Sequence, residues 1–245
     1  IRIRKMRFHA LTEMLLSCSS EEDFENVQVF FDREEKNYRE NEKKNFDLIK
    51  DALYVSKVQF YYKNNRIEET YNAILNVTDK KNRAILLRNT FAVINQNAVE
   101  SQEFHVAHNL LLLGKKKFPE SLDSSKAIVT YWNNYLVFFT QQGKYLEALS
   151  LLKEENGELN EKDKYRLFDV LYNSYAYSEY KKENFLLAAE ICADACKTLG
   201  NKKSIMENMK IYYLNAYKQA MKVGDSNLEL KIKNKACVYF PNFPE

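Results

Sequence analysis

The stretch YWNNYLVFFTQQGKYLEALSLL, residues 131–152, decides the fold. Apolar residues recur at spacings of three and four on both sides of a polar break at QQGK, which is typical of two amphipathic helices joined by a turn. Ala148 follows the aromatic Tyr145 by three residues, and Leu152 follows Ala148 by four. A small residue at this place lets the second helix approach the first closely. The stretch therefore predicts a tightly packed helical hairpin.

The same pattern recurs along the chain at intervals of about forty residues. LYNSYAYSEYKKENFLLAAEICADA (171–195) breaks at KKEN, and the segment 96–119 repeats the spacing with Phe104, Ala107, Leu111 and Gly114. The small-residue position falls at 27, 70, 107, 148, 188 and 230. One hairpin cannot bury its own apolar face, so repeated hairpins stack on one another. We expect an all-α fold, a right-handed α-α superhelix of about six tetratricopeptide-like helix pairs. No Gly/Ser-rich linker divides the chain, which predicts a single repeat domain over residues 1–245.

Composition excludes several other classes of protein. The chain has only 5 Gly and 3 Pro in 245 residues, too few for the turns of an all-β or doubly wound α/β fold. The net charge of +3 indicates no general affinity for nucleic acid. No apolar run is long enough to cross a membrane, no secretory signal is present, and 4 Cys do not make a disulfide framework. We expect a cytoplasmic protein with no membrane contact.

Catalytic and metal-binding motifs are absent from the sequence. Cys192 and Cys196 lie four residues apart, and His105 and His108 lie three apart, but zinc needs four ligands, or three and a water, and no second matching pair is present. Core packing therefore explains these cysteines and histidines better than a zinc site does. The chain contains no GxSxG, GxGxxG or GxxxxGK[ST] motif. We expect no enzyme activity, no cofactor and no metal.

Three asparagines occupy one place in successive units. Asn133, Asn173 and Asn215 each lie fifteen residues before the small-residue position of their unit. In tetratricopeptide proteins this place faces the concave groove, where a side-chain amide offers donors and an acceptor to the backbone of an extended peptide. The other positions that the register assigns to this groove are Thr130, Val137, Thr140, Val170, Tyr177, Tyr180, Tyr212, Gln219 and Lys222, with Gln59, Tyr62, Asn89, Ala92 and Gln96 in the second and third units.

The stretched helix pairs and the recurrent asparagines resemble the C-terminal domain of the Rgg/PlcR-type quorum-sensing transcription regulators of low-GC Gram-positive bacteria. The resemblance implies that the domain binds a short imported pheromone peptide and forms a homodimer. It implies that Asn133, Asn173 and Asn215 hold the peptide backbone. It also implies that DNA is bound only through an N-terminal helix-turn-helix domain, which we expect to be missing from this chain.

Two other functions remain open on the sequence alone. One is a tetratricopeptide-like scaffold that binds a tail or helix of a partner protein and has no role in transcription. The other is a helical-repeat enzyme or phosphatase regulator, which requires a catalytic Gln or Glu on a separate helical bundle. The aromatic C-terminal segment KACVYFPNFPE (235–245) also has two interpretations. It folds back on the last helix pair, or it is buried against a second copy of the chain.

Overall fold

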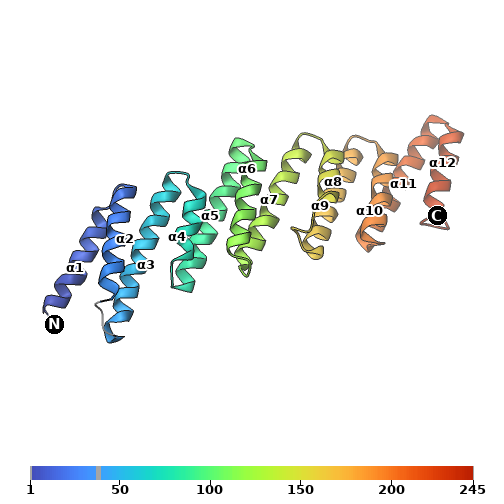
Figure 1. The fold of residues 1–245 in the computed structure, drawn as a ribbon. Coiled ribbons are helices and arrows are strands. Elements are labelled where there is room, and N and C mark those ends of the chain that lie inside the picture. Colours follow the sequence, from blue (N-terminus) through green and yellow to red (C-terminus); the bar gives the residue numbers. More distant parts are fainter. Residues whose placement is uncertain (1, 37–39, 245) are drawn as a thin grey trace. The chain divides into compact units, whose positions relative to one another are not determined.

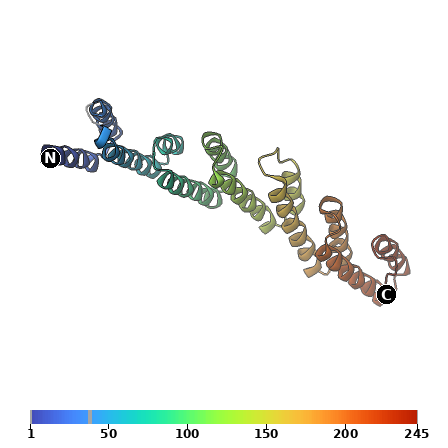
Figure 2. The same cartoon turned by 90° about the horizontal axis from the view of Figure 1, so that it is seen from below.

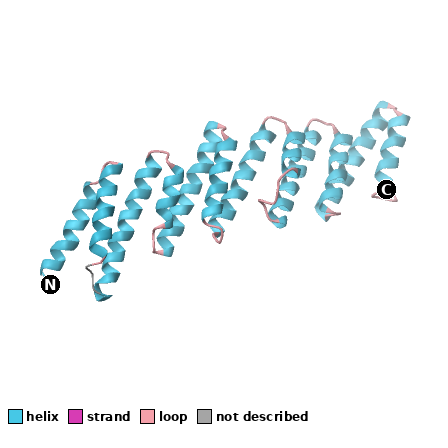
Figure 3. Cartoon of the chain, viewed as in Figure 1, coloured by secondary structure: helices cyan, strands magenta, loops and turns pink. Residues whose placement is uncertain are grey.

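The fold is all-helical, as the repeat pattern predicts (Figures 1 and 3). The computed structural model describes residues 2–36 and 40–244, with the side chains of 9–36 and 43–244, and these residues form twelve α-helices and no strand. The chain divides into two compact units, Ile1–Tyr131 and Trp132–Glu245. None of the twelve described helices is long and apolar enough to cross a membrane.

The first unit holds six helices and the start of a seventh, and the second unit holds the rest of that helix and five more. The helices are α1 (Arg2–Ser17), α2 (Glu21–Glu35), α3 (Glu40–Lys63), α4 (Ile67–Leu75), α5 (Lys80–Ser101), α6 (Phe104–Lys117), α7 (Leu122–Gln141), α8 (Tyr145–Lys153), α9 (Glu161–Lys181), α10 (Phe185–Leu199), α11 (Lys203–Val223) and α12 (Ser226–Cys237).

Consecutive helices of the first unit pack as hairpins. α3 packs against α4 and α5 against α6, while α1 and α2 pack against each other and against α3. Figure 2 shows α4 and α6 on the same side of α3 and α5. The predicted small-residue positions Val27, Thr70 and Ala107 are all buried. Burial at these three positions confirms the predicted register for α2, α4 and α6.

Aromatic rings surround Gly114 on α6. The Tyr71 ring of α4 lies 5.9 Å from the Phe91 ring of α5 and 6.1 Å from the Phe118 ring, measured between centroids. A Cβ atom at position 114 would lie 2.6 Å from Phe91 Cε1 and 2.7 Å from Tyr71 Oη. Ordinary carbon contacts begin near 3.5 Å, so only glycine fits here without movement of a ring.

A capping box closes the N-terminus of α2. The Ser20 hydroxyl accepts a hydrogen bond from the N–H of Asp23 at 3.2 Å. The Asp23 carboxylate accepts from the N–H of Ser19 at 2.9 Å and of Ser20 at 2.8 Å. Hydrogen bonds from the Ser19 N–H, the Ser20 hydroxyl and the Ser20 N–H, in that order, lower the pKa of Asp23 to about 2.

We expect the cap to lose its effect in acid. The folded pKa of Asp23 lies below the unfolded value of about 3.9, so its contribution is present above pH 4 and is lost as the pH falls towards 2. Replacing Ser20 with alanine removes one hydrogen-bond donor and should raise the pKa of Asp23. An NMR titration of the side-chain carboxyl carbon measures this value. An unchanged Asp23 pKa in Ser20→Ala contradicts the assigned role of the hydroxyl.

The second unit repeats the hairpin arrangement. α9 packs against α10 and α11 against α12, and α10 also packs against α11. Figure 2 shows α10 and α12 on the same side of α11. Ala148 on α8 and Ala188 on α10 are fully buried, which confirms the predicted register for these two helices.

The register predicted for the last helix is wrong. Leu230 is 59% exposed, whereas Ile232 and Ala236 are fully buried. The Asp225 carboxylate accepts a hydrogen bond from the N–H of Leu228 at 2.9 Å and fixes the start of α12. From that start, the helix turns Ile232 and Ala236 inward and Leu230 towards solvent.

The aromatic C-terminal segment folds back on its own unit. Phe243 is buried, and its ring stands edge-on to the rings of Tyr213 and Tyr217 on α11, with centroids 6.3 and 5.9 Å apart. The thiol of Cys237 donates to the carbonyl of Phe243 at 3.9 Å. Phe243 therefore folds back on the last helix pair, whereas Val238 in the same segment is 76% exposed.

Candidate functional site

A hollow of about 330 Å³ lies between α3 and α5 in the first unit, and we call it the α3–α5 hollow. One face of each helix supplies its walls. Four of its lining residues are positions that the repeat register assigns to a groove, and the structure brings them together. The lining residues are Val58, Gln59, Tyr62, Leu86, Asn89, Thr90, Ala92 and Val93, of which Gln59, Tyr62, Asn89 and Ala92 are the predicted positions.

Helical spacing explains why these residues meet. Gln59 and Tyr62 lie three residues apart on α3, and Asn89 and Ala92 lie three apart on α5, so each pair shares a helix face. The buried Thr90 between them donates its hydroxyl to the carbonyl of Leu86 at 3.0 Å.

Amides stand at the rim of this hollow. Within the described residues, the side-chain amides of Gln59 and Asn89 have no hydrogen-bond partner. The floor below them is formed by aliphatic side chains. Unpartnered amides above an apolar floor suit an uncharged ligand that has both backbone-like polar groups and apolar groups.

Gln96 lies further along α5, outside the residues that line the hollow. Its side chain is exposed, and its amide donates to the Glu100 carboxylate at 2.7 Å. That hydrogen bond is local to the helix surface, so it does not prevent the side chain from turning towards a ligand.

Asn133 and Asn173 share one register in the second unit. Each directly follows a buried aromatic residue, Trp132 on α7 and Tyr172 on α9. Asn133 is exposed and Asn173 is half-buried. The Asn173 amide nitrogen donates to the backbone carbonyl of Asp169 at 2.8 Å and to its carboxylate at 3.1 Å. These two bonds leave the Asn173 side-chain oxygen to accept from a ligand N–H.

Asn215 does not share this register. The buried residues Leu171 and Tyr172 of α9 correspond to the buried Tyr212 and Tyr213 of α11, so the residue equivalent to Asn173 is Leu214. Asn215 lies one residue further on and is half-buried. Asn215 was assigned to this place because it lies fifteen residues before Leu230. Since the register of Leu230 is wrong, the assignment of Asn215 is displaced by one residue.

The predicted groove residues of α11 divide between the core and the surface. Tyr212 is only 6% exposed, and its ring stacks on that of Tyr180 at 4.9 Å. Its neighbour Ile211 is 48% exposed and takes the outward place that was predicted for Tyr212. Gln219 is exposed, as a groove residue would be. Ile211 could have been found from Val170, its apolar and exposed counterpart on α9.

Exposed apolar side chains mark the same face of the other helices. Val137 on α7 and Tyr177 on α9 are 42% and 53% exposed. The Tyr177 and Tyr180 ring planes are inclined by 23° with their centroids 6.4 Å apart, and the Lys181 ammonium lies 5.3 Å from the Tyr177 centroid. α9 therefore presents a ring surface beside the Asn173 amide.

The cysteine pair and His108 belong to the packing, whereas His105 is exposed, so core packing does not explain His105. Burial, and then the neighbouring Cys196, raise the pKa of the Cys192 thiol to about 12, so it stays protonated at neutral pH. The His108 ring stacks on the ring of Tyr131 at 4.8 Å. Among the side chains that the structure describes, no three His, Cys, Asp or Glu residues are placed to hold a metal ion.

Comparisons with family models, with curated proteins and with solved structures find no match to this chain.

Proposed function

We propose that this chain binds a short, largely apolar peptide, and that each unit offers its own candidate face: α3 and α5 in the first unit, and α9 with the end of α7 and with α11 in the second. We propose further that it is the regulatory domain of a transcription regulator of the Rgg/PlcR type. In this proposal the helix pairs form a right-handed, tetratricopeptide-like superhelix, the domain is a homodimer, and DNA contact belongs to a separate helix-turn-helix domain. The α3–α5 hollow is the observation that carries the proposal.

The hollow supports peptide binding because its composition matches the needs of a peptide. A peptide in extended conformation carries one N–H and one C=O per residue, and Gln59 and Asn89 offer both a donor and an acceptor. The aliphatic floor formed by residues such as Val58, Leu86 and Val93 takes an apolar side chain. A volume of about 330 Å³ accommodates one large side chain and the backbone beside it.

The second unit supports the proposal through Asn133 and Asn173. Both amides lie on helix faces that also present exposed apolar groups, Val137 on α7 and Val170 and Tyr177 on α9. Amide oxygens and amide nitrogens bind peptide backbone whatever its side chains are, while the apolar groups select hydrophobic side chains.

A thermal-shift screen of synthetic hydrophobic octapeptides against the intact chain tests the proposal, because a ligand of the native state raises the melting temperature. For a peptide found in this way, we expect the affinity to fall about tenfold in calorimetry on substitution of the amide in the unit that binds it, Asn89→Ala in the first unit or Asn173→Ala in the second. Loss of one amide that pairs with desolvated backbone costs about 1–3 kcal/mol.

The matched control is Asn109→Ala, the same substitution at an exposed position of α6, on a different helix from the proposed amides. We expect this variant to bind the peptide as the wild type does. If the affinity is unchanged in both Asn89→Ala and Asn173→Ala, these amides do not hydrogen-bond the peptide backbone and that part of the proposal is wrong. A screen without any stabilising peptide argues against the receptor function itself.

A second hollow favours the scaffold alternative. It has a volume of about 320 Å³ and lies between α8 and α10 with α9 as its floor. Leu146 and Leu187 stand at its edges, 68% and 40% exposed, above the buried Leu149 and Ile191. Such a trough suits an amphipathic helix of a partner protein. Leu187→Asp distinguishes the two functions, because it should abolish binding of a partner helix and leave octapeptide affinity unchanged.

A further inference from the structure

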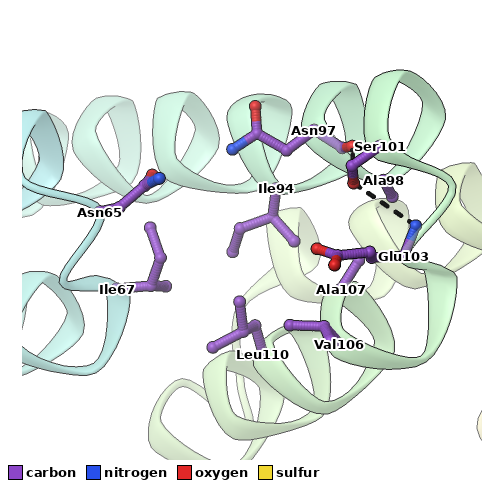
Figure 4. A pocket seen from close by; sticks show the side chains of 10 residues that line it. All are labelled: Asn65, Ile67, Ile94, Asn97, Ala98, Ser101, Glu103, Val106, Ala107 and Leu110. Atoms are coloured by element: carbon purple, nitrogen blue, oxygen red, sulfur yellow. Dashed lines mark hydrogen bonds between the residues drawn. The ribbon is translucent and has the colours of Figure 1, made fainter.

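A third hollow, of about 200 Å³, opens among α4, the last turns of α5 and the start of α6. Figure 4 shows the ten side chains around it. Its residues differ from those of the α3–α5 hollow throughout, although both lie in the first unit. It therefore stands apart from the proposed peptide site.

Apolar side chains form the floor of this hollow and polar side chains form its rim. Ile67, Ile94 and Leu110 converge on the interior from three helices (Figure 4). Asn65 and Asn97 stand at the rim, and both are exposed. The floor offers contact to an aliphatic chain, and the rim offers amide oxygens to a polar head group.

The Glu103 carboxylate gives this hollow its charge. Its side chain extends from the start of α6 over the apolar floor (Figure 4). In the described part of the chain the carboxylate has neither an ion-pair partner nor a hydrogen-bond partner. The hollow between α8 and α10 differs in this respect. Its carboxylates, Glu190 and Asp194, are paired with Lys235 and Lys197.

We propose that this hollow binds a lysine side chain presented by a partner polypeptide. The four methylenes of lysine lie on Ile94 and Leu110, and the ammonium bonds to the Glu103 carboxylate. An ammonium has three N–H donors, so it can bond both oxygens of the Glu103 carboxylate. Asn65 and Asn97 stand away from Glu103 at the rim (Figure 4), and their amides bind the backbone that flanks the lysine.

An NMR titration of the ¹⁵N-labelled intact chain tests the proposal. The probes are N-acetyl-lysine methylamide, its uncharged analogue N-acetyl-norleucine methylamide, and spermidine as a free amine. We expect the lysine probe to shift the amides of Asn65, Glu103 and Leu110 and to bind about tenfold more tightly than the norleucine probe. Spermidine should bind more weakly than the lysine probe, because it has no backbone amides for the asparagines.

Two matched variants locate the effect. Glu103→Gln should abolish the tenfold preference for lysine over norleucine. Glu100→Gln should keep it, because Glu100 lies outside the hollow and accepts from Gln96. Equal affinity for lysine and norleucine, or a preference that survives Glu103→Gln, overturns the proposal. The proposal is also overturned if the lysine probe causes no shift, or if spermidine binds more tightly than the lysine probe, which would indicate a site for free amines.

Discussion

Replacing Gly114 with valine is expected to destabilise the protein by about 3 kcal/mol, and replacing it with alanine by about 1–2 kcal/mol. Helix propensity alone predicts the opposite, because alanine is favoured over glycine inside a helix by about 1 kcal/mol. Packing overrides it here. The new Cβ would lie within 2.8 Å of Tyr71 Cζ and closer still to Tyr71 Oη and Phe91 Cε1, and both rings are buried.

The Tyr71 hydroxyl allows a sharper test of this contact. It is buried and has no hydrogen-bond partner among the residues that the structure describes, and burial raises the pKa of Tyr71 far above its usual value. Tyr71→Phe removes an unsatisfied polar group and should leave stability unchanged or raise it by about 1 kcal/mol. It also removes one of the atoms that a Cβ at position 114 meets. In the double variant, the cost of Gly114→Ala should therefore fall.

Urea unfolding followed by circular dichroism gives the four free energies of this double-mutant cycle. We expect a favourable coupling of about 0.5–1 kcal/mol between Tyr71→Phe and Gly114→Ala. If Gly114→Ala raises stability, the helix gain exceeds the steric cost and the close approach is not needed. If the two substitutions are additive, the hydroxyl is not the atom that excludes a side chain.

The repeat register could be predicted from sequence because it depends on helix geometry alone. Within a unit, the residues that pack one helix against another recur with the helical period, as Ala107, Leu111 and Gly114 do. From unit to unit the position recurs after about forty residues, at Thr70, Ala107, Ala148 and Ala188, which are buried. A small side chain at such a place is a strong signal. At Gly114 the same periodicity indicated a buried position, and the absence of a side chain matches the rings that fill the space.

The face of α11 could not be predicted in the same way. Tyr212 and Tyr213 are adjacent and chemically identical, and both are buried, so the pattern does not say which neighbour faces outward. In the last unit the predicted position holds Leu230, which is large and exposed and so gives no signal of close helix packing. The start of α12 is set by the Asp225 cap, a local signal that the count from unit to unit ignored.

Residue spacing predicts which site residues share a helix face, but it does not predict where a hollow forms. Spacing placed Gln59 and Tyr62 on one helix face and Asn89 and Ala92 on another. It could not show that a hollow separates the two helices, since that depends on how side chains about thirty residues apart pack. The sequence did not predict the hollow among α4, α5 and α6. Its floor contains periodic helix residues such as Ala107, but its polar residues Asn65 and Glu103 lie in a loop and at a helix start and have no periodic signal.

The Asp51 carboxylate ties α3 to the turn that begins α5. It accepts hydrogen bonds from the N–H of Thr78 at 2.7 Å, from the Thr78 hydroxyl at 2.9 Å and from the N–H of Asp79 at 2.8 Å. Asp51 is buried, so each of these donors loses its partner if the carboxylate is removed. The contact also fixes the start of α5 against α3, the two helices that form the α3–α5 hollow.

Asp51→Asn is expected to destabilise the protein by about 2–3 kcal/mol, because an asparagine has a single acceptor oxygen and its NH₂ group faces donors. Asp79→Asn is the matched control. Asp79 caps α5 by accepting from the N–H of Asn82 at 2.7 Å, and asparagine caps helices as well as aspartate, so stability should change by less than about 0.5 kcal/mol. Urea unfolding of both variants measures the difference. If both variants lose the same free energy of unfolding, the loss comes from removing a negative charge and not from the Asp51 hydrogen bonds. Apolar packing alone would then hold α3 against α5.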